Sequence, residues 1–367
     1  MDKIDRVETF EARVPLAHPL TVGSAQITHR TYSIVRITTS CGITGVGYCY
    51  SRGIPISKVI EAVMSPHIIQ ESAESADEIR HKLIAANWQS SEHGTFTSGL
   101  SAIDIALNDI MAKRSGKSVA QFLGSDLKEI PVYSVIGYDN GSDETGLEEE
   151  IDHALSRGIK SFKIVVGAKS PERDAHRIKT LRNRAGDSAL IGVDAFRSFG
   201  DLKKAKYRVD LFKEYGISFV EDAFLESQGK LSIALGEETG VPISFGESLA
   251  SANMAQQVID YNQVDILRID ALVIGGVSNF LKAADYADKS GIKYSTHIHT
   301  EVHSQIAAAT KNCYAGGIEY LDPKFEIDLF HHLLLRPIEI SDGNAQLSTS
   351  PGFGIEWDWK AIQRYSA

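Results

Sequence analysis

The sequence has few cysteines, no long hydrophobic run and no block of basic residues. Its three cysteines, Cys41, Cys49 and Cys313, are scattered and odd in number, which argues against a disulfide framework and fits a reducing compartment. The absence of a run of 18 apolar residues argues against a membrane span, and the first residues lack the apolar stretch of a signal peptide. A net charge of −10 without a basic cluster makes nucleic acid and anionic membranes unsuitable partners. We therefore expect a cytoplasmic protein that acts on small molecules.

The chain of 367 residues is long enough to bury a large core, and it has two regions that differ in their pattern of apolar and polar residues. Residues 1–50 alternate like β-strands, and residues 56–90 and 97–115 have the apolar spacing of helices, so the first third predicts a small α+β unit. From residue 131 onward, short apolar runs alternate with polar helical stretches. The runs are "PVYSVIG", "SFKIVVG", "LIGVDAF", "SFVEDAF", "PISFGES", "DILRIDA", "KYSTHIH" and "GIEYLDP".

These eight runs with helical connections predict parallel β/α units, and eight is the number of strands that closes a barrel. An open doubly wound sheet is the structural alternative. Such a sheet usually carries a glycine-rich phosphate-binding fingerprint after its first strand, and "VIGYDNGSD" does not match one. The sequence therefore favours an α/β barrel.

An ionisable side chain lies near the carboxyl end of seven of the predicted strands, at intervals of 22 to 31 residues, about one β/α unit each. Carboxylates at the ends of buried strands are costly unless they are paired or bind a metal. A solvated loop acid would be the ordinary explanation for any one of them, but not for the whole series. We predict that they form a site at one face of the barrel: Lys163, Asp194, Glu221, Glu247, Asp270, His297 and Glu319.

Two groups within this series predict different chemistry. Asp194, Glu221 and Glu247 lie on three consecutive strands and offer only oxygen ligands, which suits Mg²⁺. Asp270 and His297 lie on the next two strands, where a carboxylate beside an imidazole would make a general base. Lys163 lies across the barrel from His297 and could bring positive charge to the substrate.

The segment "STHIHTEVH" places His297, His299 and His303 close together in sequence, ahead of the helix-like "SQIAAATKN". A zinc site is an alternative for such a cluster. Because the three acids upstream already supply ligands for a hard metal, we expect His299 and His303 to be polar residues beyond the strand. His299 is then a candidate contact to substrate.

The order and spacing of these motifs resemble the enolase superfamily, in particular its mandelate racemase subgroup. The segments "GVDAF", "FVEDAF" and "FGESL" resemble the family's metal-ligand segments, "RIDALVIGGVSN" with "STHIH" resembles its Asp–His dyad, and "SGLSAIDIALNDIMAK" and "SPGFGIEWD" resemble parts of its capping domain. The resemblance implies a modified TIM barrel, (β/α)7β, over residues 126–324, with an α+β capping domain from residues 1–125. Residues 325–367 would return to that cap, and the protein would form a homo-oligomer, a dimer or an octamer.

The resemblance also implies a chemistry in which Mg²⁺ on the three acids stabilises an enediolate. His297 would remove the proton α to a substrate carboxylate, and Asp270 would orient the imidazole. Glu319, as the acid of the last strand, would be protonated and donate a hydrogen bond to the substrate carboxylate. The neighbouring Asp322 leaves that last assignment open.

The sequence departs from the family pattern at several positions. The second strand usually carries Lys-x-Lys, and here Val165 follows Lys163 where the second lysine would stand and face the site. Phe196 takes the place of the asparagine in the family's Asp-x-Asn. Arg268 shares a face with Asp270, where it either binds substrate or forms a salt bridge inside the barrel.

Loops of the cap are expected to close over the barrel mouth. Residues 17–31 and 48–56 are the corresponding segments, and their polar side chains either contact a polyol or a second carboxylate or are simply solvated. The candidates are His18, Arg30, Tyr48 and Arg52.

With a base on one side only, syn dehydration is feasible whereas two-base racemisation is not favoured. We therefore expect a lyase, an acid-sugar dehydratase. Cycloisomerisation of a sugar lactone or anhydro-sugar acid is the second expectation, and a racemase or epimerase the third. A degenerate homologue that binds a sugar acid without turnover is the alternative from a different class.

Overall fold

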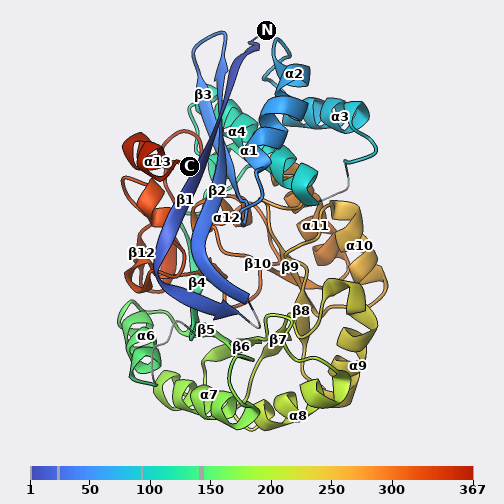
Figure 1. The fold of residues 1–367 in the computed structure, drawn as a ribbon, viewed down its shortest axis with the longest axis vertical. Coiled ribbons are helices and arrows are strands. Elements are labelled where there is room, and N and C mark those ends of the chain that lie inside the picture. The colour runs from blue at the N-terminus through green and yellow to red at the C-terminus, as the bar shows by residue number, and fades with distance from the viewer. Residues whose placement is uncertain (1, 23–24, 92–93, 140–143, 367) are drawn as a thin grey trace.

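The computed structural model describes residues 2–22, 25–91, 94–139 and 144–366, and it begins with a long antiparallel sheet (Figure 1). Its three strands are paired in sequential order: β1 (Ile4–Val22), β2 (Ala25–Thr39) and β3 (Thr44–Tyr50). The strands predicted for this region are confirmed, although β1 and β2 extend well beyond the segments in which apolar and polar residues alternate. Their register shifts between Pro15 and Leu20, so that the far end of the pair projects over the barrel.

Helices follow this sheet in the N-terminal region. They are α1 (Ile56–Val59), η1 (Ile60–Met64), α2 (Ser65–Ile68), α3 (Ala76–Ala86), α4 (Gly94–Arg114) and α5 (Val119–Phe122). Among them, α1, η1 and α4 pack on the strands of the sheet. Helix α4 is buried along most of its length because it packs directly on β3. Gly45 and Gly47 permit this contact: a Cβ atom at Gly47 would lie 2.0 Å from the carbonyl oxygen of Ala102.

A parallel β/α barrel follows, and each of the eight apolar runs forms one of its strands in the described part of the chain. The strands are β4 (Glu129–Ile136), β5 (Ser161–Val165), β6 (Leu190–Asp194), β7 (Phe219–Glu221), β8 (Ile243–Phe245), β9 (Ile266–Ile269), β10 (Lys293–Thr296) and β11 (Ile318–Tyr320). The helices between them are α6 (Glu144–Ser156), α7 (Pro171–Ala185), α8 (Leu202–Lys213), α9 (Gly229–Thr239) with the short η2 (Glu226–Gln228), α10 (Ala252–Asp260), α11 (Val277–Lys289) and α12 (Thr300–Ala307). Strands β4 to β10 pair in sequential order and β11 pairs with β4, which gives the predicted (β/α)7β barrel.

The C-terminal segment runs back from the barrel to the first sheet. Its elements are η3 (Pro323–Phe325), η4 (Phe330–Leu333), β12 (Ile340–Ser341), β13 (Asn344–Gln346) and α13 (Trp359–Tyr365). Helix α13 lies beside β1 (Figure 1), where Phe10 and Trp359 are in ring contact at 5.3 Å. Strands β12 and β13 join the barrel sheet beside the first residues of β4, whereas α13 packs on β1 and, with the N-terminal region, forms the cap over the carboxyl ends of the barrel strands. Among the helices of the described residues, none combines the length and apolar character needed to cross a bilayer.

Candidate active site

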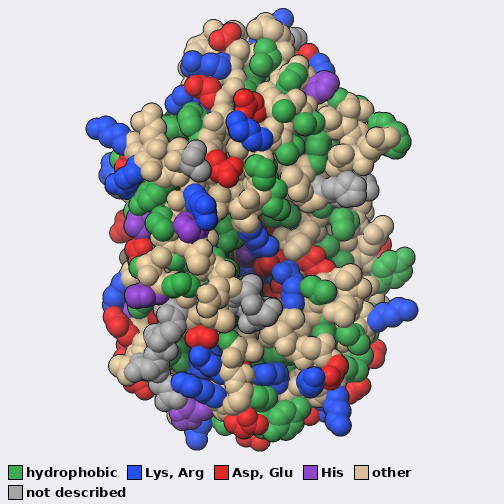
Figure 2. All heavy atoms as spheres, in the orientation of Figure 1, with side chains coloured by type: hydrophobic (Ala, Val, Ile, Leu, Met, Phe, Trp, Pro, Cys, Tyr) green, Lys and Arg blue, Asp and Glu red, His purple; other side chains and the backbone are tan. Residues whose placement is uncertain are grey.

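A cavity of about 630 Å³ lies between the cap sheet and the carboxyl ends of the barrel strands. Figure 2 shows a hollow in the middle of this face, where acidic, basic and histidine side chains gather. The cap contributes Arg30, Tyr50 and Arg52 to its lining, and the barrel contributes Asp194 and His297 among others. Residues far apart in sequence therefore meet at the face where the strand-end series was predicted to lie.

The three acids predicted to bind a metal occupy three neighbouring strand ends. Asp194 and Glu221 are the last residues of β6 and β7, and Glu247 follows β8 by two residues. Asp194 and Glu247 line the cavity, and Glu221 lies fully buried beneath it. The Oε2 atom of Glu221 is buried without a hydrogen-bond partner. Hard oxygen donors with one carboxylate oxygen unsatisfied fit a Mg²⁺ ion in ligand type.

Two cations lie among these acids. The guanidinium of Arg268 contacts Glu221 and lies 3.3 Å from Glu247 and 2.9 Å from Glu319. The ammonium of Lys163 contacts Glu221 and lies 3.5 Å from Asp194 and 2.9 Å from Glu319. The structure shows the salt bridge expected for Arg268 inside the barrel, and Arg268 also lines the cavity, so its contact to substrate stays a prediction.

Among the described residues, the acid triad is not a group whose oxygens all lie within 4.8 Å of one another. Burial disfavours the charge of Lys163, but the surrounding acids, Glu319 and Asp194 among them, outweigh burial and raise its pKa. A Mg²⁺ ion bound by Glu221 and Glu247 would compete with the guanidinium of Arg268 for their oxygens.

The predicted dyad is present. His297 Nδ1 lies 2.7 Å from Asp270 Oδ2, and the imidazole faces the cavity. Asp270 also accepts a hydrogen bond of 2.8 Å from the backbone N–H of Leu272. Although burial opposes ionisation, the hydrogen bond from His297 holds the pKa of Asp270 well below its ordinary value. An ionised Asp270 fixes the proton on Nδ1 of His297, so that Nε2, which lies 3.4 Å from Glu247 Oε2, can accept another.

His303 supports this dyad, which sequence reasoning did not anticipate. It is fully buried on α12, where Nδ1 contacts the carbonyl oxygen of Ile298 at 2.6 Å. Because a carbonyl only accepts, Nδ1 carries the proton and Nε2 accepts the N–H of Ala271 at 3.0 Å. His303 thus lies beyond the strand as expected, but it is buried and braces the backbone next to Asp270, a role that was not predicted. The only sequence signal was its position four residues beyond His299.

His299 does not line the cavity, contrary to the prediction of a substrate contact. It is buried among aromatic rings, 5.4 Å from the ring of Tyr48, and burial lowers its pKa to about 4. Ile298 and His299 have positive φ angles of 37° and 54°, so the chain is no longer extended at these residues. The alternation of side chains between the two faces of the strand therefore ends before His299. The ring centroids of His297 and His299 are 6.1 Å apart, and these histidines do not form a three-ligand metal group within the described residues.

Glu319, and not Asp322, is the acid of the last strand that faces the barrel interior. Glu319 is buried and also accepts the backbone N–H of Ile298 at 2.8 Å. Burial opposes its charge, but Arg268 and Lys163 lower its pKa to about 2. This environment favours a carboxylate that accepts hydrogen bonds, whereas the resemblance implied a protonated donor. Asp322 lies elsewhere, 2.6 Å from Arg157.

The two residues that depart from the family pattern on the second and third barrel strands have different surroundings. Val165 is buried in an apolar cluster with Leu20 of the cap, so it does not line the cavity directly. Phe196 does line the cavity, and its ring meets that of Tyr138 edge-on at 5.8 Å. Apolar side chains thus replace polar ones on the side of the barrel away from His297.

The candidate residues of the cap fall into two groups. Arg52 lines the cavity and lies 3.3 Å from Glu247, and Arg30 lines it while donating to Tyr50 at 2.7 Å. Tyr48 is fully buried and stacks on Phe330 at 4.2 Å, so its predicted contact to substrate is wrong. His18 is exposed and does not line the cavity. Residues 23–24 of the predicted loop lie outside the described residues.

Arg197 is a cavity residue that the sequence did not single out. Its guanidinium lies 2.9 Å from Asp222 and 3.3 Å from Glu247. It follows Phe196, and both have positive φ, so the turn after β6 directs consecutive side chains to one site. Its position directly after the Asp-x-Phe motif is the sequence signal that could have identified it.

Comparison with known proteins decides the family. The family model for the mandelate racemase/muconate lactonizing enzyme N-terminal domain matches residues 4–124, and the model for the enolase C-terminal domain-like fold matches residues 146–361. The chain belongs to the mandelate racemase subgroup of the enolase superfamily.

Relatives in this subgroup include enzymes of more than one reaction class. The chain is 29% identical to the L-talarate/galactarate dehydratase of Salmonella typhimurium, over 96% of this chain and 89% of that protein. It is 27% identical to a chloromuconate cycloisomerase of Cupriavidus necator, over 99% of both. The L-talarate dehydratase of Polaromonas sp. JS666, crystallised with Mg and L-glucarate, superposes with a TM-score of 0.90 at 26% identity, over 100% of this chain and 98% of that one. The chain is thus an enzyme of a subgroup that contains acid-sugar dehydratases and cycloisomerases.

Proposed function

We propose that this protein is a Mg²⁺-dependent acid-sugar dehydratase, a hydro-lyase that removes the proton α to a carboxylate and eliminates water. One observation carries the proposal: the imidazole of His297 faces the cavity with Asp270 fixed behind it, while Val165 stands where the family carries a second base. Lys163 cannot readily replace that base because its ammonium is fully buried against three carboxylates. A site with one base favours chemistry on one face of the substrate.

The proton moves through His297 twice. Its Nε2 takes the proton from C2 of the substrate, which leaves an enediolate, and the ionised Asp270 stabilises the imidazolium that results. The imidazolium then gives a proton to the hydroxyl leaving C3 on the same face, so that water departs and an enol remains. The enol converts to a 3-deoxy-2-keto acid. A positioned base of this kind typically contributes about 10²–10⁴-fold to the rate.

The remaining charges bind and orient the acid. Asp194, Glu221 and Glu247 would hold Mg²⁺, which when bound stabilises the negative charge that develops on the substrate carboxylate. Arg52 and Arg197 on the cavity wall can bind hydroxyls or a second carboxylate of the sugar acid. The dehydratases among the relatives make talarate, galactarate and arabinonate the first acids to test.

Cycloisomerisation is the second candidate, supported by the chloromuconate cycloisomerases that match along the whole chain and by a 3,6-anhydro-α-L-galactonate cycloisomerase. It also requires a base on one side only. A racemase or epimerase ranks third because Val165 cannot exchange a proton. A binding protein without turnover is disfavoured, because a site that does no catalysis would not need the hydrogen bonds that keep the Asp–His dyad oriented.

The test is incubation of the enzyme with Mg²⁺ and a panel of mono- and diacid sugars in D2O, followed by proton NMR. Loss of the C2 signal together with a new 3-deoxy-2-keto product supports dehydration and names the substrate. A rearranged product of unchanged composition would favour the cycloisomerase. Epimer formation would favour the racemase, and binding without any exchange would favour the binding protein. Metal dependence of the reaction checks the cofactor: chelator-treated enzyme should regain activity with Mg²⁺, and activity restored by Zn²⁺ but not by Mg²⁺ would contradict the Mg²⁺ proposal.

The family resemblance further implies a homo-oligomer. We propose a dimer, or an octamer assembled from dimers, and sedimentation velocity measures which is formed.

A further inference from the structure

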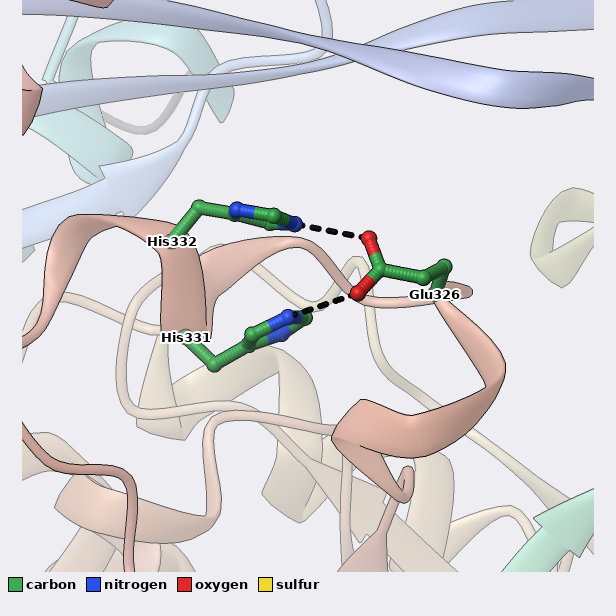
Figure 3. Close-up of side chains that lie close together, drawn as sticks. All are labelled: Glu326, His331 and His332. Carbon is green, nitrogen blue, oxygen red and sulfur yellow. Dashed lines mark hydrogen bonds and ion pairs between the residues drawn. The ribbon is translucent and has the colours of Figure 1, made fainter.

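Three potential metal ligands converge outside the barrel, on the segment that leads from the last strand to the cap (Figure 3). Glu326 ends η3, and His331 and His332 lie on η4. His331 Nε2 lies 3.1 Å from Glu326 Oε1, and His332 Nε2 lies 2.6 Å from Glu326 Oε2. Within the part of the chain that the structure describes, this is the group of three His, Cys, Asp or Glu side chains whose ligand atoms all lie within 4.8 Å of one another.

The hydrogen-bond pattern of this cluster brings two acceptor atoms face to face unless a positive charge lies between them. His331 Nδ1 lies 3.0 Å from the carbonyl oxygen of Asp328, which can only accept, so Nδ1 carries the proton of the ring. In a neutral imidazole, Nε2 then presents a lone pair to Glu326 Oε1, and an ionised carboxylate also only accepts. Two acceptors face each other at 3.1 Å. Either a second ring proton or a bound cation must lie between them.

The donor set fits a divalent transition ion. Two imidazole nitrogens and one carboxylate are ligands that suit Zn²⁺, which binds them at about 2.0–2.2 Å, whereas Mg²⁺ prefers oxygen ligands throughout. The hydrogen bond from His331 Nδ1 to a backbone carbonyl is the second contact that orients a histidine ligand. His331 and His332 are 17% and 32% exposed, so an ion can enter and the rings can adjust.

We propose that Glu326, His331 and His332 form a second metal site, which binds Zn²⁺ or a similar ion and fastens the cap to the barrel. The segment is already tied to the cap: Arg30 donates to the carbonyl of Ile327 at 2.9 Å, and Tyr32 donates to Asp328 at 2.6 Å. Because Arg30 and Asp328 both line the active-site cavity, an ion here stabilises one wall of that cavity. The inference does not depend on the reaction assigned to the barrel.

The test is calorimetric titration of chelator-treated full-length protein with Zn²⁺ in the presence of saturating Mg²⁺, with thermal unfolding measured in parallel. We expect one equivalent of Zn²⁺ to bind at micromolar concentration or below and to raise the midpoint of unfolding. His332→Gln and Glu326→Gln should each weaken binding at least 30-fold. His67→Gln, which changes an exposed histidine on α2, serves as the matched control and should bind as the wild type does.

Cobalt supplies an independent readout that does not depend on stability. Co²⁺ bound by two imidazoles and a carboxylate should give visible absorption bands that the Glu326→Gln and His332→Gln variants lack. Zn²⁺ binding that is equally tight in both variants, or absent below about 100 µM in the wild type, would overturn the proposal. The cluster would then be an ion pair between a carboxylate and a protonated imidazole.

Discussion

Replacing Arg268 with methionine should strengthen the binding of Mg²⁺ to the barrel. The guanidinium is 2% exposed and lies among Glu221, Glu247 and Glu319, at 3.3 Å from Glu247 and 2.9 Å from Glu319. At an effective dielectric constant of about 20, unit charges about 4 Å apart interact with about 4 kcal/mol. If even a third of this opposes the ion, the variant should bind Mg²⁺ about tenfold more tightly, which corresponds to about 1.4 kcal/mol.

The same substitution should destabilise the metal-free protein. Removing one partner of a buried ion pair leaves uncompensated charge and typically costs about 3–5 kcal/mol. Calorimetric Mg²⁺ titration and thermal unfolding with and without EDTA measure both effects. Arg184→Met, which removes an arginine from a surface ion pair with Glu148, is the control and should leave Mg²⁺ affinity unchanged. An unchanged or weaker affinity in the Arg268 variant would refute the reasoning, because Arg268 would then support the metal site instead of competing with the ion.

Two further predictions concern the cap. Burial raises the pKa of Asp104 to about 7, above its unfolded value, so its contribution to stability is present below about pH 4 and is lost as pH rises through about 7. Asp104→Asn should therefore flatten the dependence of the unfolding free energy on pH in that window, by a few kcal/mol; equal slopes in urea titrations would contradict this. Gly47→Ala should destabilise the protein by about 1–3 kcal/mol or more, because its Cβ would lie 2.0 Å from the carbonyl oxygen of Ala102. Chemical unfolding tests it, and a variant as stable as the wild type would show that β3 and α4 can separate at low cost.

The barrel could be predicted from the sequence because its signals are local and repeated. Each strand is a short apolar run, and seven of the eight runs have an ionisable residue near their carboxyl end, so that the period of the β/α unit alone brings Asp194, Glu221 and Glu247 to one face. The dyad of Asp270 and His297 follows from the same reasoning, since adjacent parallel strands end side by side.

The remaining features depend on turns and on contacts between distant segments, which no local pattern reveals. His299 was expected near the substrate because it lies two residues from His297, but the positive φ angles of Ile298 and His299 turn it into the aromatic core. Tyr48 was assigned to the cavity from its loop-like setting, although the C-terminal Phe330 covers it. The ionised state of Glu319 depends on Arg268, a side chain from a strand that is not its neighbour in the sheet.

The central claim is that His297 removes the proton α to the substrate carboxylate. Its most direct test is the rate of C2 deuterium incorporation in D2O, measured by proton NMR on the first acid found to react, for the wild type and for His297→Asn. Binding of the same acid is measured in parallel by calorimetry. The account predicts that the variant still binds the acid and loses exchange by at least about 10²-fold. Exchange at the wild-type rate in the variant would show that another group takes the proton, and the one-base mechanism would be wrong.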